Sequence, residues 1–144
     1  MEAKVNTIEK AFTEIAHLLL PSEFKNLVMV EKAIDELFSD YQFGDELYGR
    51  VMVASHEAVS NAIIHGNEKD PFRTVDIRFL LNDENLVIMV EDQGEGFDYE
   101  DVQDPTNPGS LIRSPGRGMF LMKNLSDKII FINNGRKIRM EFQL

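Results

Sequence analysis

Two neighbouring segments with strand-like patterns constrain the fold more than any other feature of the sequence. Residues 74–81 alternate between apolar and polar side chains, which is typical of a strand with one buried face. Residues 86–90 are apolar throughout and predict a central strand that is covered more fully. The turn-forming residues 82–85 separate the two strands. A sheet built around this pair needs an apolar layer on at least one face.

Segments with helical periodicity can supply that layer. Apolar residues at spacings of three and four predict an amphipathic helix over about 23–39. A second helix, from about 45 to 66, has an interior rich in alanine and serine, and these small side chains allow close packing. A third helix is expected after Gly116. Residues 15–20 suggest a strand, and the stretch before them either continues it or forms a short helix.

The chain ends in a predicted hairpin. Residues 128–132 and 136–142 both read as strands, and Asn134-Gly135 between them is a strong hairpin signal. Taken together, the pattern predicts an α+β two-layer sandwich, with helices on one face of a mixed, mostly antiparallel sheet. We expect residues 1–144 to form a single domain, in which residues 1–21 are an N-terminal extension or strand.

Charge and composition exclude several classes of function. The 144 residues carry a formal net charge of −10 and no basic cluster of the kind that nucleic-acid-binding proteins show. The sequence contains no cysteine, and no apolar run approaches the roughly 20 residues of a membrane-spanning helix. Its first residues lack the pattern of a secretory signal. We therefore expect a cytoplasmic protein that binds neither nucleic acid nor membrane directly.

The second predicted helix carries an unusual set of polar residues. Glu57, Asn61 and His65 are four residues apart and should share one face. An amide oxygen such as that of Asn61 suits Mg²⁺, which is commonly held by one or two protein oxygens together with phosphates and water. Glu57, one turn away, could accept a proton from an attacking hydroxyl. Taken alone, the same spacing is also typical of a solvated polar face.

Two glycine-containing motifs follow. In the first, Asp92 ends the apolar strand and precedes Gly94 and Gly96, where the backbone can approach a ligand and the carboxylate can accept a hydrogen bond from an exocyclic amine. In the second, Gly116 and Gly118 open a helix, whose free amides form a ready phosphate site. Either motif alone would fit an ordinary turn or helix start.

The order and spacing of the three motifs are more specific. The series E-x-x-x-N-A-x-x-H-G, D-x-G-x-G and G-x-G-x-x-L resembles the nucleotide site of the GHKL superfamily, over about residues 22–144. Within it, the segment V-A-S-H-E-A-V-S-N-A-I-I-H-G is similar to the first motif of the anti-sigma-factor serine/threonine kinases of the anti-sigma B and anti-sigma F type.

This resemblance implies the Bergerat ATP-binding fold and a role for each motif. It implies ATP and Mg²⁺ as ligands, Glu57 as the catalytic carboxylate, Asn61 as the magnesium ligand and Asp92 as the acid that reads adenine. The glycines would shape the base pocket and close over the phosphates: Gly94, Gly96, Gly116 and Gly118. Residues 97–115 would form a lid.

The resemblance also implies partners, and it leaves alternatives. A kinase of this type would be a homodimer that binds a sigma factor and phosphorylates an anti-sigma-factor antagonist. One alternative is a nucleotide-gated binding module without kinase activity. Another is a stand-alone ATPase domain of the histidine-kinase type, acting on a separate histidine carrier.

Overall fold

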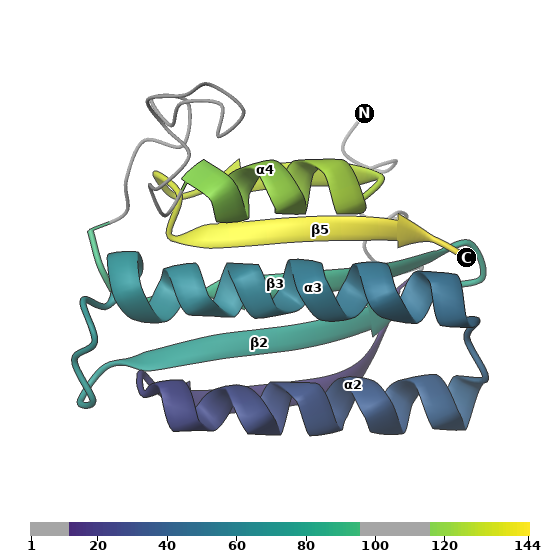
Figure 1. The fold of residues 1–144 in the computed structure, drawn as a ribbon, viewed down its shortest axis with the longest axis horizontal. Coiled ribbons are helices and arrows are strands. Elements are labelled where there is room, and N and C mark those ends of the chain that lie inside the picture. The colour runs from purple at the N-terminus through teal and green to yellow at the C-terminus, as the bar shows by residue number, and fades with distance from the viewer. Residues whose placement is uncertain (1–11, 96–115) are drawn as a thin grey trace.

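The computed structural model describes residues 12–95 and 116–144, and its helices lie together on one side of a sheet (Figure 1). The elements in chain order are β1 (Thr13–Pro21), the 3-10 turn η1 (Phe24–Asn26), α2 (Leu27–Tyr41), α3 (Asp45–Asn61), the π-helical turn η2 (Ala62–Gly66), β2 (Thr74–Leu81), β3 (Asn85–Glu91), α4 (Gly116–Leu125), β4 (Lys128–Ile132) and β5 (Lys137–Gln143). The predicted lid, residues 97–115, lies outside the described residues.

The five strands form one sheet in the order β1-β2-β3-β5-β4, and every neighbouring pair is antiparallel. Helix α3 crosses the middle of the sheet, between α2 and α4 (Figure 1). The predicted α+β two-layer sandwich is therefore confirmed, but the sheet of the described residues is antiparallel throughout and not mixed, because each of its four strand pairs runs in opposite directions. No helix in the described ranges is both long and apolar enough to cross a membrane.

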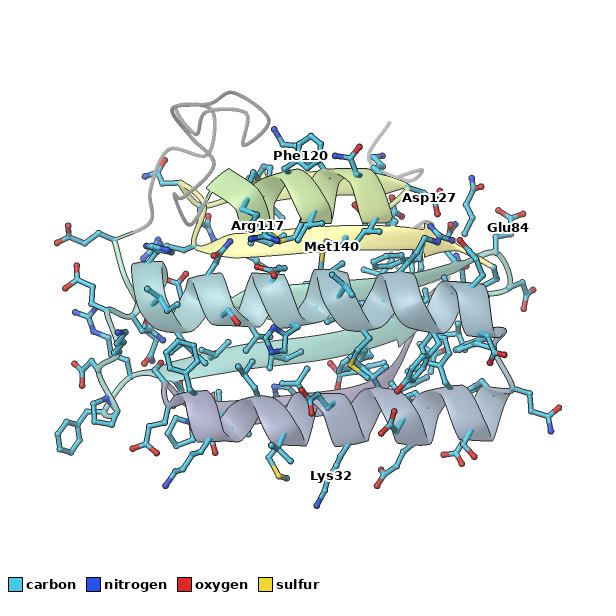
Figure 2. The ribbon with its side chains drawn as sticks, viewed as in Figure 1. Lys32, Glu84, Arg117, Phe120, Asp127 and Met140 are labelled. Atoms are coloured by element: carbon cyan, nitrogen blue, oxygen red, sulfur yellow. The ribbon has the colours of Figure 1, made fainter. Side chains whose placement is uncertain are left out.

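The core lies between the helices and the sheet, as the sequence periodicity requires. Helix α2 buries one face, through Leu27, Val30, Ile34, Leu37 and Phe38. Three small residues of α3, Ala54, Ser55 and Ala58, are fully buried, so this helix packs closely on β3 and β5. From the sheet side, alternate residues of β5 point toward the helices, and Met140 at the centre of this strand is 0% exposed (Figure 2).

Three local features differ from the sequence-based expectation or decide what it left open. Within the predicted N-terminal segment, residues 13–21 form the strand β1, which pairs with β2 and is irregular between Glu14 and Ala16. The second predicted helix is α-helical only to Asn61, and residues 62–66 form a π-helical turn. The hairpin turn contains three consecutive residues with positive φ, Asn133, Asn134 and Gly135, which are the residue types that adopt this conformation most readily.

Antiparallel pairing brings distant parts of the chain to one end of the sheet. Glu91 at the end of β3 pairs with Asp76 near the start of β2 and with Lys137 at the start of β5. The C-terminal end of α3 and the N-terminal end of α4 lie at this same end, at the left of Figure 1. All three predicted motifs are therefore at one end of the molecule.

Candidate functional site

Glu57 and Asn61 lie against the first turn of α4. They are one turn apart on α3, where Asn61 is 1% exposed and Glu57 is partly exposed. A Cβ atom added to Gly118 would lie 2.7 Å from Oε2 of Glu57 and 3.3 Å from Nδ2 of Asn61. A side chain at position 118 would displace the end of the Glu57 side chain, so glycine allows Glu57 to lie directly against α4. The structure thus joins the first predicted motif to the third.

The Asn61 side chain is an unpartnered polar group in this junction. Its Nδ2 atom is buried and has no hydrogen-bond partner. Buried side-chain amides are normally paired, and an exception of this kind calls for an explanation. An amide that is free to bind an incoming ligand provides one.

Asp92 is packed tightly between two glycines. Gly94 donates its amide hydrogen to Oδ1 of Asp92 at 2.8 Å. A Cβ on Gly66 would collide with the Asp92 carboxylate, and a Cβ on Gly94 would collide with the carbonyl oxygen of Gly66. Both glycines are required by close approach, and the end of η2 and the end of β3 therefore form one compact unit.

Burial dominates the electrostatics of this unit. It raises the pKa of Asp92 above its ordinary value, and the Gly94 amide and the charge of Arg136 oppose this shift in part. Burial also lowers the pKa of His65, which favours its neutral form. Asp92 nonetheless accepts a hydrogen bond as a carboxylate does, in a site largely removed from water.

Two residues that the sequence analysis did not single out complete the Asp92 unit. Asn67, which is 0% exposed, accepts a hydrogen bond from the backbone amide of Gln93 at 2.7 Å. The Gln93 side chain in turn accepts one from the Thr74 amide at 2.7 Å. An asparagine directly after a predicted helix end resembles any loop residue, so no signal in the sequence could have shown that it is buried.

The other predicted residues are placed less completely. Gly116 is the first residue of α4, whereas Gly96 lies outside the described residues. Arg117 is exposed, and Figure 2 shows it at the end of α4 nearest the junction with α3. The π-helical turn changes the spacing after Asn61, so His65 does not continue the row of Glu57 and Asn61 in strict helical register.

A magnesium ion held with help from a bound phosphate chain fits these residues better than a metal held by protein groups alone. Within the described ranges, no group of three or more histidine, cysteine, aspartate or glutamate side chains is arranged to hold a metal ion. The unpartnered Nδ2 of Asn61 is a hydrogen-bond donor that suits a phosphate oxygen, whereas Mg²⁺ would need the Oδ1 of the same amide, shared with phosphates and water.

A separate open cavity of about 590 Å³ lies at the opposite end of the sheet. It is lined by Thr13, Ile15, Tyr41, Leu81, Asn82, Asp83 and Glu84. Its turn residues precede β3, whereas Asp92 follows β3, so a full strand length separates this cavity from the three motifs. None of the predicted site residues lines it.

Comparison with known proteins identifies the family. The family described as histidine kinase-like ATPase domain matches residues 20–142, which is most of the chain. The chain belongs to the histidine kinase-like ATPase family. This confirms the resemblance to the GHKL superfamily, and it assigns the Glu57–Asn61 junction and the Asp92 unit to the domain that this family shares.

Individual relatives of the chain are serine-protein kinases or an anti-sigma factor by name. The serine-protein kinase RsbW of Staphylococcus epidermidis is 26% identical over 129 residues, covering 84% of this chain and 81% of the relative. The anti-sigma F factor of Geobacillus stearothermophilus is 37% identical over 103 residues, covering 67% and 69%. The serine-protein kinase RsbW of Bacillus licheniformis is 33% identical over 95 residues, covering 61% and 59%.

Proposed function

We propose that this protein is an ATP-dependent serine/threonine protein kinase of the anti-sigma type. In this proposal it acts in the cytoplasm as a homodimer, binds a sigma factor and phosphorylates an anti-sigma-factor antagonist. The family match and the names of the relatives support an ATP-binding regulator of this class. The observation that carries the proposal is the position of Glu57, one turn from Asn61 and directly against Gly118.

At the phosphate end of the proposed site, each group has a distinct task. Asn61 would hold Mg²⁺ through its amide oxygen, and the ion would neutralise charge on the phosphates. The backbone amides at the start of α4, including that of Gly118, would face the phosphates. In this geometry the terminal phosphate lies close to the Glu57 carboxylate.

Phosphoryl transfer then requires a nucleophile and a proton acceptor. The oxygen of a seryl hydroxyl on the antagonist attacks the γ-phosphorus, and the bond between that phosphorus and the β,γ-bridging oxygen breaks. Glu57 accepts the hydroxyl proton, and ADP leaves with the bridging oxygen. Glu57 is partly exposed, so a partner protein can bring a hydroxyl to it.

At the other end of the proposed site, Asp92 would read the base. Its Oδ1 atom is held by the Gly94 amide, which leaves Oδ2 as the acceptor that we assign to the exocyclic amine of adenine. Gly66 and Gly94 leave room for the Asp92 carboxylate and the Gly66 carbonyl because neither carries a side chain. Gly96 and the lid over residues 97–115 are proposed to complete the pocket.

The test combines nucleotide binding with phosphoryl transfer. ATP binding is measured by calorimetry with and without Mg²⁺, and transfer is measured from γ-labelled ATP to purified anti-sigma-factor antagonists. Glu57→Gln should abolish transfer and keep ATP affinity, because it removes the proton acceptor and preserves the shape. Glu36→Gln, on the exposed side of α2, is the matched control and should leave both unchanged.

Three results would redirect the proposal. Normal transfer by the Glu57→Gln variant would remove Glu57 from catalysis. Magnesium-dependent ATP binding without transfer to any antagonist would favour a nucleotide-gated binding module. Phosphate that is lost from the partner in acid would indicate phosphohistidine, and so a histidine carrier rather than a serine.

A further inference from the structure

Asn67 joins four separate segments of the chain through one buried side chain. Its own backbone closes η2, where its amide donates to the Ala62 carbonyl at 2.8 Å. Its Oδ1 atom accepts from the Gln93 amide at 2.7 Å. Its Nδ2 atom donates to the Thr74 carbonyl at 2.9 Å and to the Ser22 hydroxyl at 2.6 Å. Ser22 is itself buried, so the Asn67 side chain and this partner are closed to water, whereas Thr74 is partly exposed and Gln93 is exposed.

These bonds act on Asp92 through its neighbours on the chain. The backbone amide of Asp92 donates to the Arg136 carbonyl at 2.9 Å. The backbone amide of the next residue, Gln93, donates to Oδ1 of Asn67. With both flanking peptide groups fixed, the direction of the Asp92 side chain follows from the backbone. Of the two fixing groups, only Asn67 is a side chain that substitution can remove.

The surroundings leave Asp92 little tolerance. Its carboxylate fills the space above Gly66, and Gly94 passes directly over the Gly66 carbonyl. A small rotation of the Gln93 peptide would change both contacts and would move Oδ2 away from any ligand placed to meet it. Polar recognition of this kind depends on geometry to within about 0.5 Å.

We propose that Asn67 is a positioning residue that sets the base selectivity of the nucleotide site. It touches no nucleotide. It holds the Gln93 peptide, so that Asp92 presents one oxygen toward a 6-amino group and disfavours a 6-keto group at the same place. This inference rests on the proposed role of Asp92 in base recognition, and it is independent of kinase activity.

The experiment measures the affinities of ATP and inosine triphosphate by calorimetry. The two nucleotides share their phosphates and ribose and differ at position 6 of the base. Wild type should prefer ATP. Asn67→Ala should bind ATP about tenfold more weakly, which corresponds to about 1.4 kcal/mol, and should bind inosine triphosphate almost as well as wild type does. The preference between the two should therefore fall by about the same factor.

Ser22→Ala is the matched control. It removes one partner of Asn67 and leaves the bond to Gln93 in place, so the preference should remain within about twofold of wild type even if stability falls. If Asn67→Ala does not fold, Asn67→Ser carries the same test, because its hydroxyl is too short to replace the bond to Gln93 and can bind water in the vacated space.

The outcomes separate this inference from the proposed function. An unchanged preference in the Asn67 variants, with wild type selective, would overturn the positioning role and leave the proposed function intact. A wild type that binds both nucleotides equally would overturn base reading by Asp92 and the role of Asn67 with it. A wild type that binds neither nucleotide would overturn both proposals.

Discussion

The carboxylate of Asp92 occupies the space in which a side chain on Gly66 would have to lie. Gly66 ends the turn that follows α3, and Asp92 follows β3, so the two come from separate elements that meet at one end of the sheet. This contact holds Asp92, the carboxylate that we assign to adenine recognition, at a fixed distance from the helix that carries Glu57 and Asn61. A substitution of Gly66 should therefore affect both stability and nucleotide binding, whereas a substitution of Asp92 can separate the two.

Gly66→Ala should reduce stability and nucleotide affinity together. The added methyl group collides with the Asp92 carboxylate, and we expect the free energy of unfolding to fall by about 1–3 kcal/mol. Gly49→Ala is the control within the preceding helix, because nothing lies within 4 Å of its Cβ position. There the better helix propensity of alanine should raise stability by about 0.5–1 kcal/mol. Chemical denaturation of both variants measures the difference, and equal effects would contradict the contact.

Asp92→Asn should separate binding from stability. The amide oxygen of asparagine can still accept from Gly94, whereas the amide nitrogen offers adenine a donor in place of an acceptor. We expect ATP affinity to fall about 10- to 100-fold. Stability at neutral pH should be equal to that of wild type or higher, because burial raises the pKa of Asp92 and its ionised form therefore opposes folding. Calorimetry measures the ATP affinity of the variant, and thermal unfolding of the same sample measures its stability. A large loss of stability would contradict the predicted separation of the two.

The same pKa shift predicts how ATP affinity depends on pH. Protonation removes the acceptor, so ATP affinity should decrease as the pH falls through the raised pKa of Asp92 in the folded protein. The contribution of Asp92 to folding runs the other way. Its neutral form is favoured in the folded chain, and this relative stabilisation is lost as the pH rises from the unfolded to the folded pKa. ATP titrations across acidic pH, with Asp92→Asn as the insensitive reference, test the first statement.

Gly118→Ala should leave the fold intact and impair phosphoryl transfer. The added Cβ would lie 2.7 Å from Oε2 of Glu57, and the flexible end of that side chain can move away. Because alanine also favours helix, we expect stability within about 1 kcal/mol of wild type. Displacing the proposed proton acceptor by about 1 Å should lower the transfer rate by about 100-fold. A normal rate would show that the position of Glu57 does not limit transfer.

Arg50 links α3 to the end of α4, and its loss should destabilise that junction. Its Nη1 atom donates to the Leu125 carbonyl at 3.0 Å and lies 3.6 Å from Asp127. Since it binds a terminal carbonyl of a helix, Arg50→Ala should lower the free energy of unfolding by about 1–2 kcal/mol. Glu46→Ala removes only the exposed partner on the same helix and should cost less than about 1 kcal/mol. Urea denaturation compares the two variants. Equal losses of unfolding free energy would show that Arg50 stabilises the protein through Glu46 rather than through the Leu125 carbonyl.

Much of the fold could be predicted because its signals are local. The alternation of residues 74–81 and the apolar run 86–90 specified two strands, and both are present at nearly those positions. The helical spacing of apolar residues predicted α2, and the segment rich in small residues predicted most of α3. The segment before Pro21 was ambiguous, because a short apolar run fits a strand or a helix until pairing with β2 decides. The π-helical turn at residues 62–66 has no sequence pattern of its own.

The sequence by itself pointed to the residues that we propose to carry the chemistry. Glu57, Asn61, Asp92 and the glycines that follow stood out because their types and spacings are local properties of the chain. Only the tertiary structure decided how they meet. The decisive contacts join segments that are far apart in sequence: Gly118 with Glu57, Gly66 with Asp92, and Asn67 with Gln93. Such contacts depend on antiparallel pairing and helix packing. A buried polar group must find a hydrogen-bond partner, and which partner lies within reach is decided only when the chain has folded.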